Sequence, residues 1–134
     1  MEERIVNLAK YRIEKAETDL EAAKLLLANN LFAQSLNRSY YAIFHAARAL
    51  LAFDKFDSKK HSGIIAYFNQ KYINTGMFGK EYSKIIMSAE RIRNKSDYSD
   101  FYFATKQEAE SQMRQAEKFV EGVRQFIRRH HQVE

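Results

Sequence analysis

Residues 38–51 read RSYYAIFHAARALL, a stretch that decides the fold because it predicts a helix with apolar side chains on more than one face. The main apolar stripe continues through residues 31–53 with spacings of three and four residues, which is typical of a helix packed in a bundle. Its members are Ala33, Leu36, Tyr40, Ile43, Ala47 and Leu50. Four more residues lie on the flank or the far side of the same helix, namely Tyr41, Phe44, His45 and Arg48.

The second face of this helix needs a cover, because a helix that is apolar on more than one face is usually buried on more than one face. We expect the cover to be a second copy of the chain. This predicts a homodimer with Tyr41, Phe44, His45 and Arg48 at the interface, near its two-fold axis. The alternative is cover within one chain, by the last predicted helix or by a loop expected at residues 96–104. The pattern alone leaves both open.

The composition favours helices in one domain. The chain has 134 residues with no proline, four glycines and no cysteine. A chain of this length buries enough surface for one stable core, and the lack of cysteine excludes disulfides and thiolate metal sites. The sequence therefore predicts a single all-α domain over residues 1–134.

Five helices are predicted, over residues 2–28, 31–53, 59–74, 80–95 and 105–129. The expected bundle stripe of the first consists of Ala9, Ile13, Ala16, Leu20, Ala23 and Leu27. Short connections between long helices favour an up-and-down antiparallel bundle of four to five helices.

Residues that favour helix ends support these boundaries. Asn29 and Asn30 are expected to end the first helix, because asparagine tolerates the left-handed conformation. Ser58 is expected to cap the third helix. Thr105 and Glu108 are expected to form a capping box at the start of the fifth.

The charge and hydropathy of the chain narrow its possible partners. A formal net charge of +5 permits binding to nucleic acid or to an acidic partner. The first residues are charged and enter a helical pattern directly, and no apolar run approaches the about 18 residues of a transmembrane helix. We therefore expect a cytoplasmic protein with no membrane partner.

Arg38 and His45 form the first candidate site. They are seven residues apart, almost two helical turns, so both side chains project from the same side. Histidine can move protons near neutral pH, and an adjacent arginine can hold a phosphate and stabilise the charge that develops in cleavage. The pair would suit metal-independent RNA hydrolysis with the ribose 2′-hydroxyl as nucleophile. The alternative is a flank or interface histidine beside a solvated or ion-paired arginine.

Residues 91–98, RIRNKSDY, form the second candidate site. Arg91, Arg93 and Asn94 are the expected phosphate contacts. Asp97, four residues after Arg93, would orient that arginine, and Tyr98 would form a wall of the site. The alternative is an ion pair that ends the fourth helix and pins Tyr98 into the bundle.

His61 lies on the apolar side of the third predicted helix, at its first turn, and is interpreted as a core or capping histidine. No carboxylate or second histidine is spaced with it to make a metal site. We expect no metal and no cofactor.

Three motifs in this order resemble the HEPN domain family, and the resemblance covers nearly the whole chain. They are the YYAIFHAARALL run at residues 40–51, the KHSG run at residues 60–63 with Phe68, and Arg91/Arg93 leading to Asp97-Tyr98. The chain looks most similar to the small stand-alone bacterial and archaeal branch. The resemblance implies a four- to five-helix bundle, usually dimeric, that associates with nucleotides or RNA.

The same resemblance implies one of two roles. Some members are endoribonuclease toxins with an Arg-x4–6-His motif that often begins Arg-Asn, and others are non-catalytic partners of a small nucleotidyltransferase. Arg93-Asn94 matches the start of the motif, but Asp97 stands where its histidine is expected. Arg38 and His45 fit the spacing on an earlier helix. We expect a non-catalytic module that binds nucleotide or RNA phosphate and pairs with a minimal nucleotidyltransferase. The alternatives are a metal-independent endoribonuclease that uses Arg38 and His45, and a purely structural interaction protein.

Overall fold

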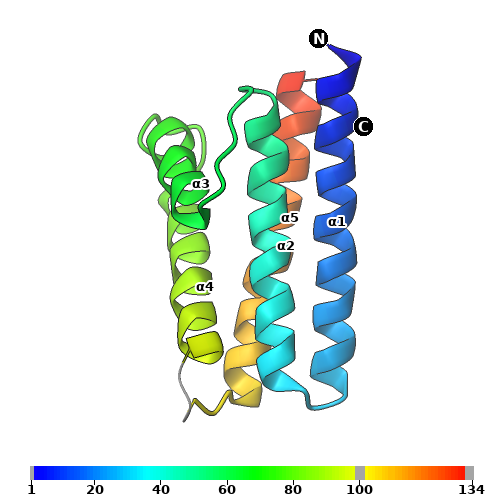
Figure 1. Cartoon of the computed structure of the whole chain (residues 1–134), viewed down its shortest axis with the longest axis vertical. Coiled ribbons are helices and arrows are strands. Elements are labelled where there is room, and N and C mark those ends of the chain that lie inside the picture. The colour runs from blue at the N-terminus through cyan, green and yellow to red at the C-terminus, as the bar shows by residue number, and fades with distance from the viewer. Residues whose placement is uncertain (1, 99–101, 132–134) are drawn as a thin grey trace.

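The computed structural model describes residues 2–98 and 102–131, and its helices follow the predicted order (Figure 1). The elements are α1 (Glu3–Ala28), α2 (Phe32–Ala52), α3 (His61–Phe68), the π-helical turn η1 (Asn69–Ile73), α4 (Lys80–Tyr98) and α5 (Lys106–His131). The described residues contain no strand, so the prediction of an all-α bundle is confirmed.

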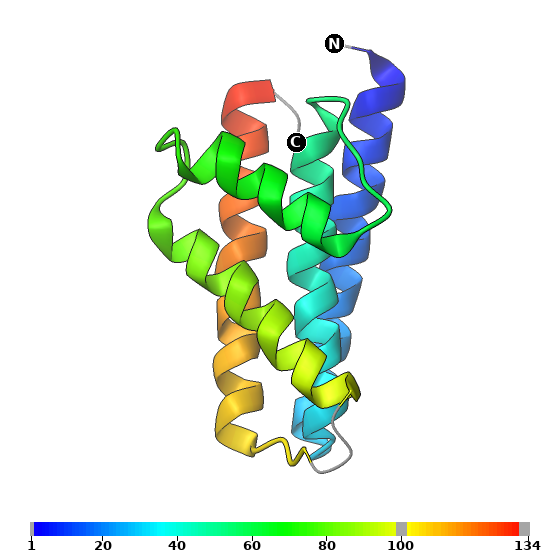
Figure 2. The same cartoon turned by 60° about the vertical axis from the view of Figure 1, so that its left-hand side comes forward.

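Helix α2 lies at the centre of the bundle and contacts α1, α3, α4 and α5. The long helices α1, α2 and α5 run side by side, and α3 and α4 cross the opposite side of α2 at an angle (Figure 2). Tyr40, Ile43 and Leu50 on α2 are at most 1% exposed. Neighbouring helices thus cover α2 from both sides, which explains why apolar side chains lie on two of its faces.

Phe44 shows how one part of the second face is covered. Its side chain is only 4% exposed in a single chain, and its ring centroid lies 4.0 Å from that of His61 at the start of α3. The cover for Phe44 is therefore α3, an element that the sequence pattern did not single out. Tyr41, by contrast, is only half-buried. A homodimer through this face stays a prediction.

Two predicted boundaries were wrong. Ser58 does not cap α3: its hydroxyl accepts a hydrogen bond from the backbone N–H of Lys60 at 3.2 Å, and the helix begins at His61. Helix α4 continues to Tyr98, so the first part of the loop expected at residues 96–104 is helical. The ion pair between Arg93 and Asp97, at 3.0 Å and four residues apart, stabilises this last turn.

The predicted end of α1 is confirmed, and of the capping box predicted at α5 the structure shows the Thr105 half. Asn30 has a φ of 63°, the left-handed conformation expected after α1. At α5, the hydroxyl of Thr105 accepts a hydrogen bond from the N–H of Glu108 at 3.1 Å. The carboxylate of Glu108 accepts a hydrogen bond from the hydroxyl of Tyr102.

Of the helices described, none combines the length and apolar character needed to cross a membrane.

Candidate functional site

The buried side of α1 carries two charged residues that the sequence analysis missed. Arg12 and Asp19 are 8% and 9% exposed, whereas Ile13 and Leu20, predicted at the seam, are half-buried. The buried set is Ile5, Ala9, Arg12, Ala16, Asp19 and Ala23. Its alternating spacing of four and three residues could have revealed both positions if Ile5 had been taken as the start of the stripe.

Asp19 brings the first candidate pair together. Its Oδ1 lies 2.9 Å from Nη1 of Arg38, and its Oδ2 lies 3.6 Å from Nε2 of His45. Arg38 and His45 do project from the same side of α2, as predicted. However, that side faces α1, and the side chain of His45 is only 14% exposed.

The environment of His45 keeps its imidazole neutral. Burial lowers its pKa to about 4, and the positive charges of Lys15, Arg48, Arg38 and Arg12 act in the same direction. These effects outweigh the nearby carboxylate of Asp19, whose own pKa is raised by burial. The contact of His45 with Asp19 is therefore not an ion pair at neutral pH. Nδ1 of His45 is buried without a hydrogen-bond partner in the part of the chain described.

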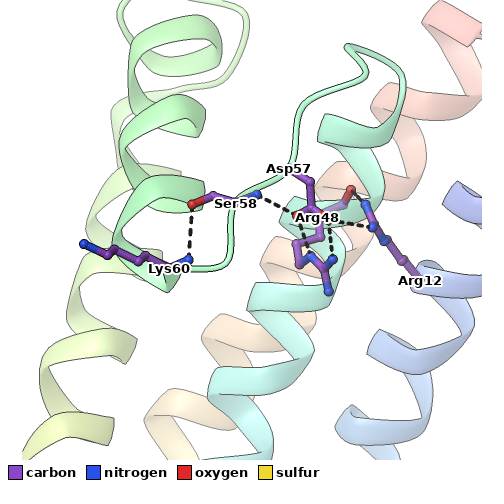
Figure 3. Close-up of polar contacts among 5 residues, drawn as sticks. All are labelled: Arg12, Arg48, Asp57, Ser58 and Lys60. Carbon is purple, nitrogen blue, oxygen red and sulfur yellow. Dashed lines mark hydrogen bonds and ion pairs between the residues drawn. The ribbon is translucent and has the colours of Figure 1, made fainter.

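A second cluster links α1 and α2 to the segment that leads into α3 (Figure 3). Arg12 donates hydrogen bonds to the backbone carbonyl of Arg48 at 3.0 Å and to Asp57 at 3.3 Å. Arg48 binds both carboxylate oxygens of Asp57, at 2.7 and 3.2 Å. The N–H of Ser58 donates to Asp57 at 2.8 Å. Burial raises the pKa of Asp57, but the hydrogen bonds from Arg48 and Ser58 outweigh it and hold the pKa below its ordinary value.

The two predicted constellations meet at Tyr41. The guanidinium of Arg93 lies 5.3 Å from the ring centroid of Tyr40 and 5.7 Å from that of Tyr41. The guanidinium of Arg38 lies 4.9 Å from the same Tyr41 ring. Arg93 also donates to the hydroxyl of Tyr41 at 3.4 Å and to Asp97 at 3.0 Å. We call this set, Arg38, Tyr40, Tyr41, Arg93 and Asp97, the Arg93 face. It forms within one chain, from α2 and α4.

His61 adjoins the Arg93 face and is tied to it by Tyr40. The hydroxyl of Tyr40 lies 2.8 Å from Nδ1 of His61, and the two rings stack 5.7 Å apart. Burial lowers the pKa of His61, and the positive charges of Arg93 and Arg48 lower it further. The imidazole is thus neutral at pH 7 and within electrostatic reach of both arginines.

Not every predicted phosphate contact lies on this face. Arg91 is exposed and donates to the hydroxyl of Ser88 at 3.4 Å, along its own helix. A step of two residues corresponds to about 200° of rotation around the helix axis, so Arg91 and Arg93 point to different sides of α4. Asn94 is exposed. The side chain of Tyr98 lies outside the described part of the chain.

Among the residues described, no group of three or more histidine, cysteine, aspartate or glutamate side chains is arranged to hold a metal ion.

Comparisons with known proteins point to one family. The model of the HEPN domain family matches residues 9–126. "Putative toxin MJ0605" of Methanocaldococcus jannaschii is 40% identical over 116 residues, covering 87% of this chain and 86% of the relative. A "UPF0332 protein" of Thermotoga maritima is 32% identical over 120 residues, covering 90% and 91%. The crystal structure of an archaeal HEPN homologue matches with a TM-score of 0.63 and 20% identity over 88% of this chain and 97% of that chain. At 20% identity, the similarity to this crystal structure shows the fold alone.

Proposed function

Because this chain belongs to the HEPN domain family, we propose that it is a non-catalytic module that binds the phosphate groups of nucleotides or RNA at the Arg93 face. The observation that carries this proposal is the contact of two guanidiniums, from Arg38 and Arg93, with the ring of Tyr41. Guanidinium groups suit phosphate oxygens, and a tyrosine ring or a guanidinium plane offers a stacking surface to a base.

The partners of Arg38 and Arg93 support a binding role. Asp19 and Asn37 hold Arg38, and Asp97 and the Tyr41 hydroxyl hold Arg93. A guanidinium fixed in this way loses less conformational entropy when it binds a ligand. Arg38 remains 37% exposed, so a ligand can reach it.

Among the side chains that the structure describes at this face, none is a suitable general base, which favours binding over cleavage. Asp97 stands where the resemblance predicts a histidine, and it is ion-paired with Arg93. His45 is mostly buried, and its pKa of about 4 makes it a weak base at neutral pH.

Direct titration tests the proposal. Fluorescence anisotropy with a labelled pentaadenylate RNA, and calorimetry with adenosine 5′-monophosphate, distinguish RNA from a free nucleotide. We expect binding of at least one probe that weakens as salt concentration rises, because phosphate contacts release counterions. A wild-type protein that binds neither probe at low salt would overturn the proposal.

Two assemblies belong to the same proposal. We expect the module to pair with a minimal nucleotidyltransferase and to form a homodimer. Of the four predicted interface residues, only Tyr41 and Arg48 remain available to a second copy, because α3 covers Phe44 and His45 faces α1. Co-expression with a small nucleotidyltransferase from a neighbouring gene should yield a complex that co-purifies. Light scattering after size exclusion should give twice the mass of the chain, and a monomer at micromolar concentration would reject the homodimer.

A second candidate function is metal-independent endoribonuclease activity. One specific observation favours it: the name of the relative from Methanocaldococcus jannaschii contains the word toxin. In this case the protein should cut single-stranded RNA in the presence of EDTA, and His45→Ala should abolish cutting. A His45→Ala variant as active as the wild type would exclude Arg38 and His45 as the site.

A further inference from the structure

A hollow in the surface adjoins the Arg93 face at its α3 end. It lies between α2 and the segment that leads into α3, and it is lined by Phe44, Arg48, Asp57, Ser58, Lys59 and His61. His61 connects the two regions, since it binds Tyr40 of the Arg93 face and also lines the hollow.

The hydrogen bond to Tyr40 determines what His61 offers to a ligand. The Tyr40 side chain is 1% exposed, and burial raises the pKa of its hydroxyl, so this group stays protonated. A buried hydroxyl needs an acceptor, and Nδ1 of a neutral imidazole provides one. We infer from this contact that the proton of His61 resides on Nε2. His61 would therefore offer a ligand an N–H donor at Nε2, not a lone pair.

Arg48 and Lys59 supply positive charge to the same hollow. The carboxylate of Asp57 accepts hydrogen bonds from Nε and Nη2 of Arg48. Within the described residues, Nη1 of Arg48 is left for another acceptor. The carboxylate of Asp57 also pairs with Arg12, so one negative charge faces two guanidiniums. Lys59 is exposed at the rim. The hollow thus has an excess of cationic donors and a hydroxyl from Ser58, a combination that suits a phosphate group.

We propose that this hollow is a second phosphate subsite, so that the ligand carries two phosphates joined through a nucleoside. The inference rests on the proposed function of the Arg93 face. The guanidinium of Arg38 lies over the Tyr41 ring and that of Arg48 over the Phe44 ring. These two ring centroids are 6.4 Å apart, a separation that two phosphates on either side of one nucleoside can span. His61 lies between the two subsites and donates Nε2–H to the ligand.

Calorimetry with two probes tests the subsite. Adenosine 5′-monophosphate carries one phosphate, whereas 5′-phosphoadenylyl-adenosine carries two. We expect the wild type to bind the dinucleotide about tenfold more tightly, because one added charge-assisted contact has roughly that effect. Lys59→Gln should weaken dinucleotide binding and leave mononucleotide binding unchanged. His61→Gln should also weaken dinucleotide binding.

Lys60→Gln is the matched control for Lys59→Gln. Both lysines are exposed on the same segment, but the Lys60 side chain points away from Arg48 and Asp57 (Figure 3). Its removal should leave dinucleotide binding unchanged. Lys59 is exposed, so its replacement should not unfold the protein. His61→Gln could weaken binding by destabilising the fold, and Lys59→Gln is therefore the decisive variant.

The outcomes separate this inference from the proposed function. If the wild type binds both probes equally, or if Lys59→Gln and Lys60→Gln behave alike, the second subsite is wrong and the Arg93 face stands. If the wild type binds neither probe, the proposed function fails and the subsite with it.

Discussion

The carboxylate of Asp19 and the guanidinium of Arg38 lie 2.9 Å apart, and they join the buried side of α1 to the candidate phosphate-binding face on α2. Asp19 is 9% exposed, and burial raises the pKa of its carboxyl although Arg38 lies beside it. Arg38 in turn lies 4.9 Å from the Tyr41 ring. The ion pair therefore has two roles, since it holds the helices together and fixes the direction of Arg38.

Asp19→Asn should destabilise the fold. The variant loses the charge that compensates Arg38 and leaves an amide in a buried position, which should cost about 2 kcal/mol of unfolding free energy. Glu17→Gln on the same helix is the matched control, because the ion pair of Glu17 with Arg124 is largely exposed and should contribute under about 0.5 kcal/mol. Urea denaturation measures both. Equal losses in the two variants would show that Asp19 has no special role.

Arg12→Met should also lower stability. Methionine keeps much of the volume of Arg12 but removes its side-chain hydrogen bond to the carbonyl of Arg48 and one partner of Asp57. We expect a loss of about 2 kcal/mol. The exposed Arg4 on α1 provides the control, since Arg4→Met makes the same chemical change without a buried contact. Thermal unfolding that is unchanged in Arg12→Met would contradict the importance of this cluster.

The stability of the fold should decrease with acidification through the range in which His45 would take up a proton. The pKa of His45 falls from 6.5 to about 4 on folding, so between these values the unfolded chain binds a proton that the folded chain does not. At 1.36 kcal/mol for each pH unit, the loss between pH 6.5 and 4 is about 3 kcal/mol. His61 and His131, whose pKa values are also lowered, add to this loss, and Asp19, whose pKa is raised, opposes it.

Comparison with His45→Gln isolates the contribution of this residue. The variant cannot be protonated there, so its unfolding free energy should fall less steeply over the same pH range. The contributions of His61 and His131 are common to both proteins and cancel in the comparison. Parallel curves of unfolding free energy against pH would reject the lowered pKa of His45.

In the Tyr40→Phe variant, the ring proton of His61 should no longer be fixed on one nitrogen. The lost hydrogen bond should cost about 1 kcal/mol of stability, and the imidazole should exchange between Nδ1–H and Nε2–H forms. Nitrogen chemical shifts of the ring measure the tautomer, which we expect to be Nε2–H in the wild type. Tyr11→Phe is the control, because Tyr11 is 57% exposed on α1. A wild-type ring protonated on Nδ1 would contradict the assignment.

The sequence was sufficient for the fold because the apolar spacing and the helix caps act locally. The helix order, the left-handed Asn30 and the Thr105 cap follow from residues close together in the chain, and the resemblance to the HEPN family is confirmed. The end of α4 was missed because a side-chain ion pair, from Arg93 to Asp97, extends the helix through residues that favour a loop.

The candidate site was only partly predictable, because its contacts join residues far apart in the chain. The predicted Arg93–Asp97 pair is present, but the meeting of Arg38 and Arg93 at Tyr41 depends on how α4 crosses α2. The roles of Arg12 and Asp19 were hidden by the choice of Ile13 and Leu20 for the seam of α1. The partner of His61, Tyr40, is 21 residues away, and no local pattern marks such a pair.

The most direct test of the central proposal is the affinity for labelled pentaadenylate of Arg93→Gln compared with Arg114→Gln. Both variants replace one arginine by glutamine, but Arg114 is 70% exposed on α5 and lies outside the Arg93 face. Arg93→Gln should weaken binding about tenfold and reduce its salt dependence, whereas Arg114→Gln should have little effect. Equal affinities of the two variants, with both folded, would contradict binding at the Arg93 face.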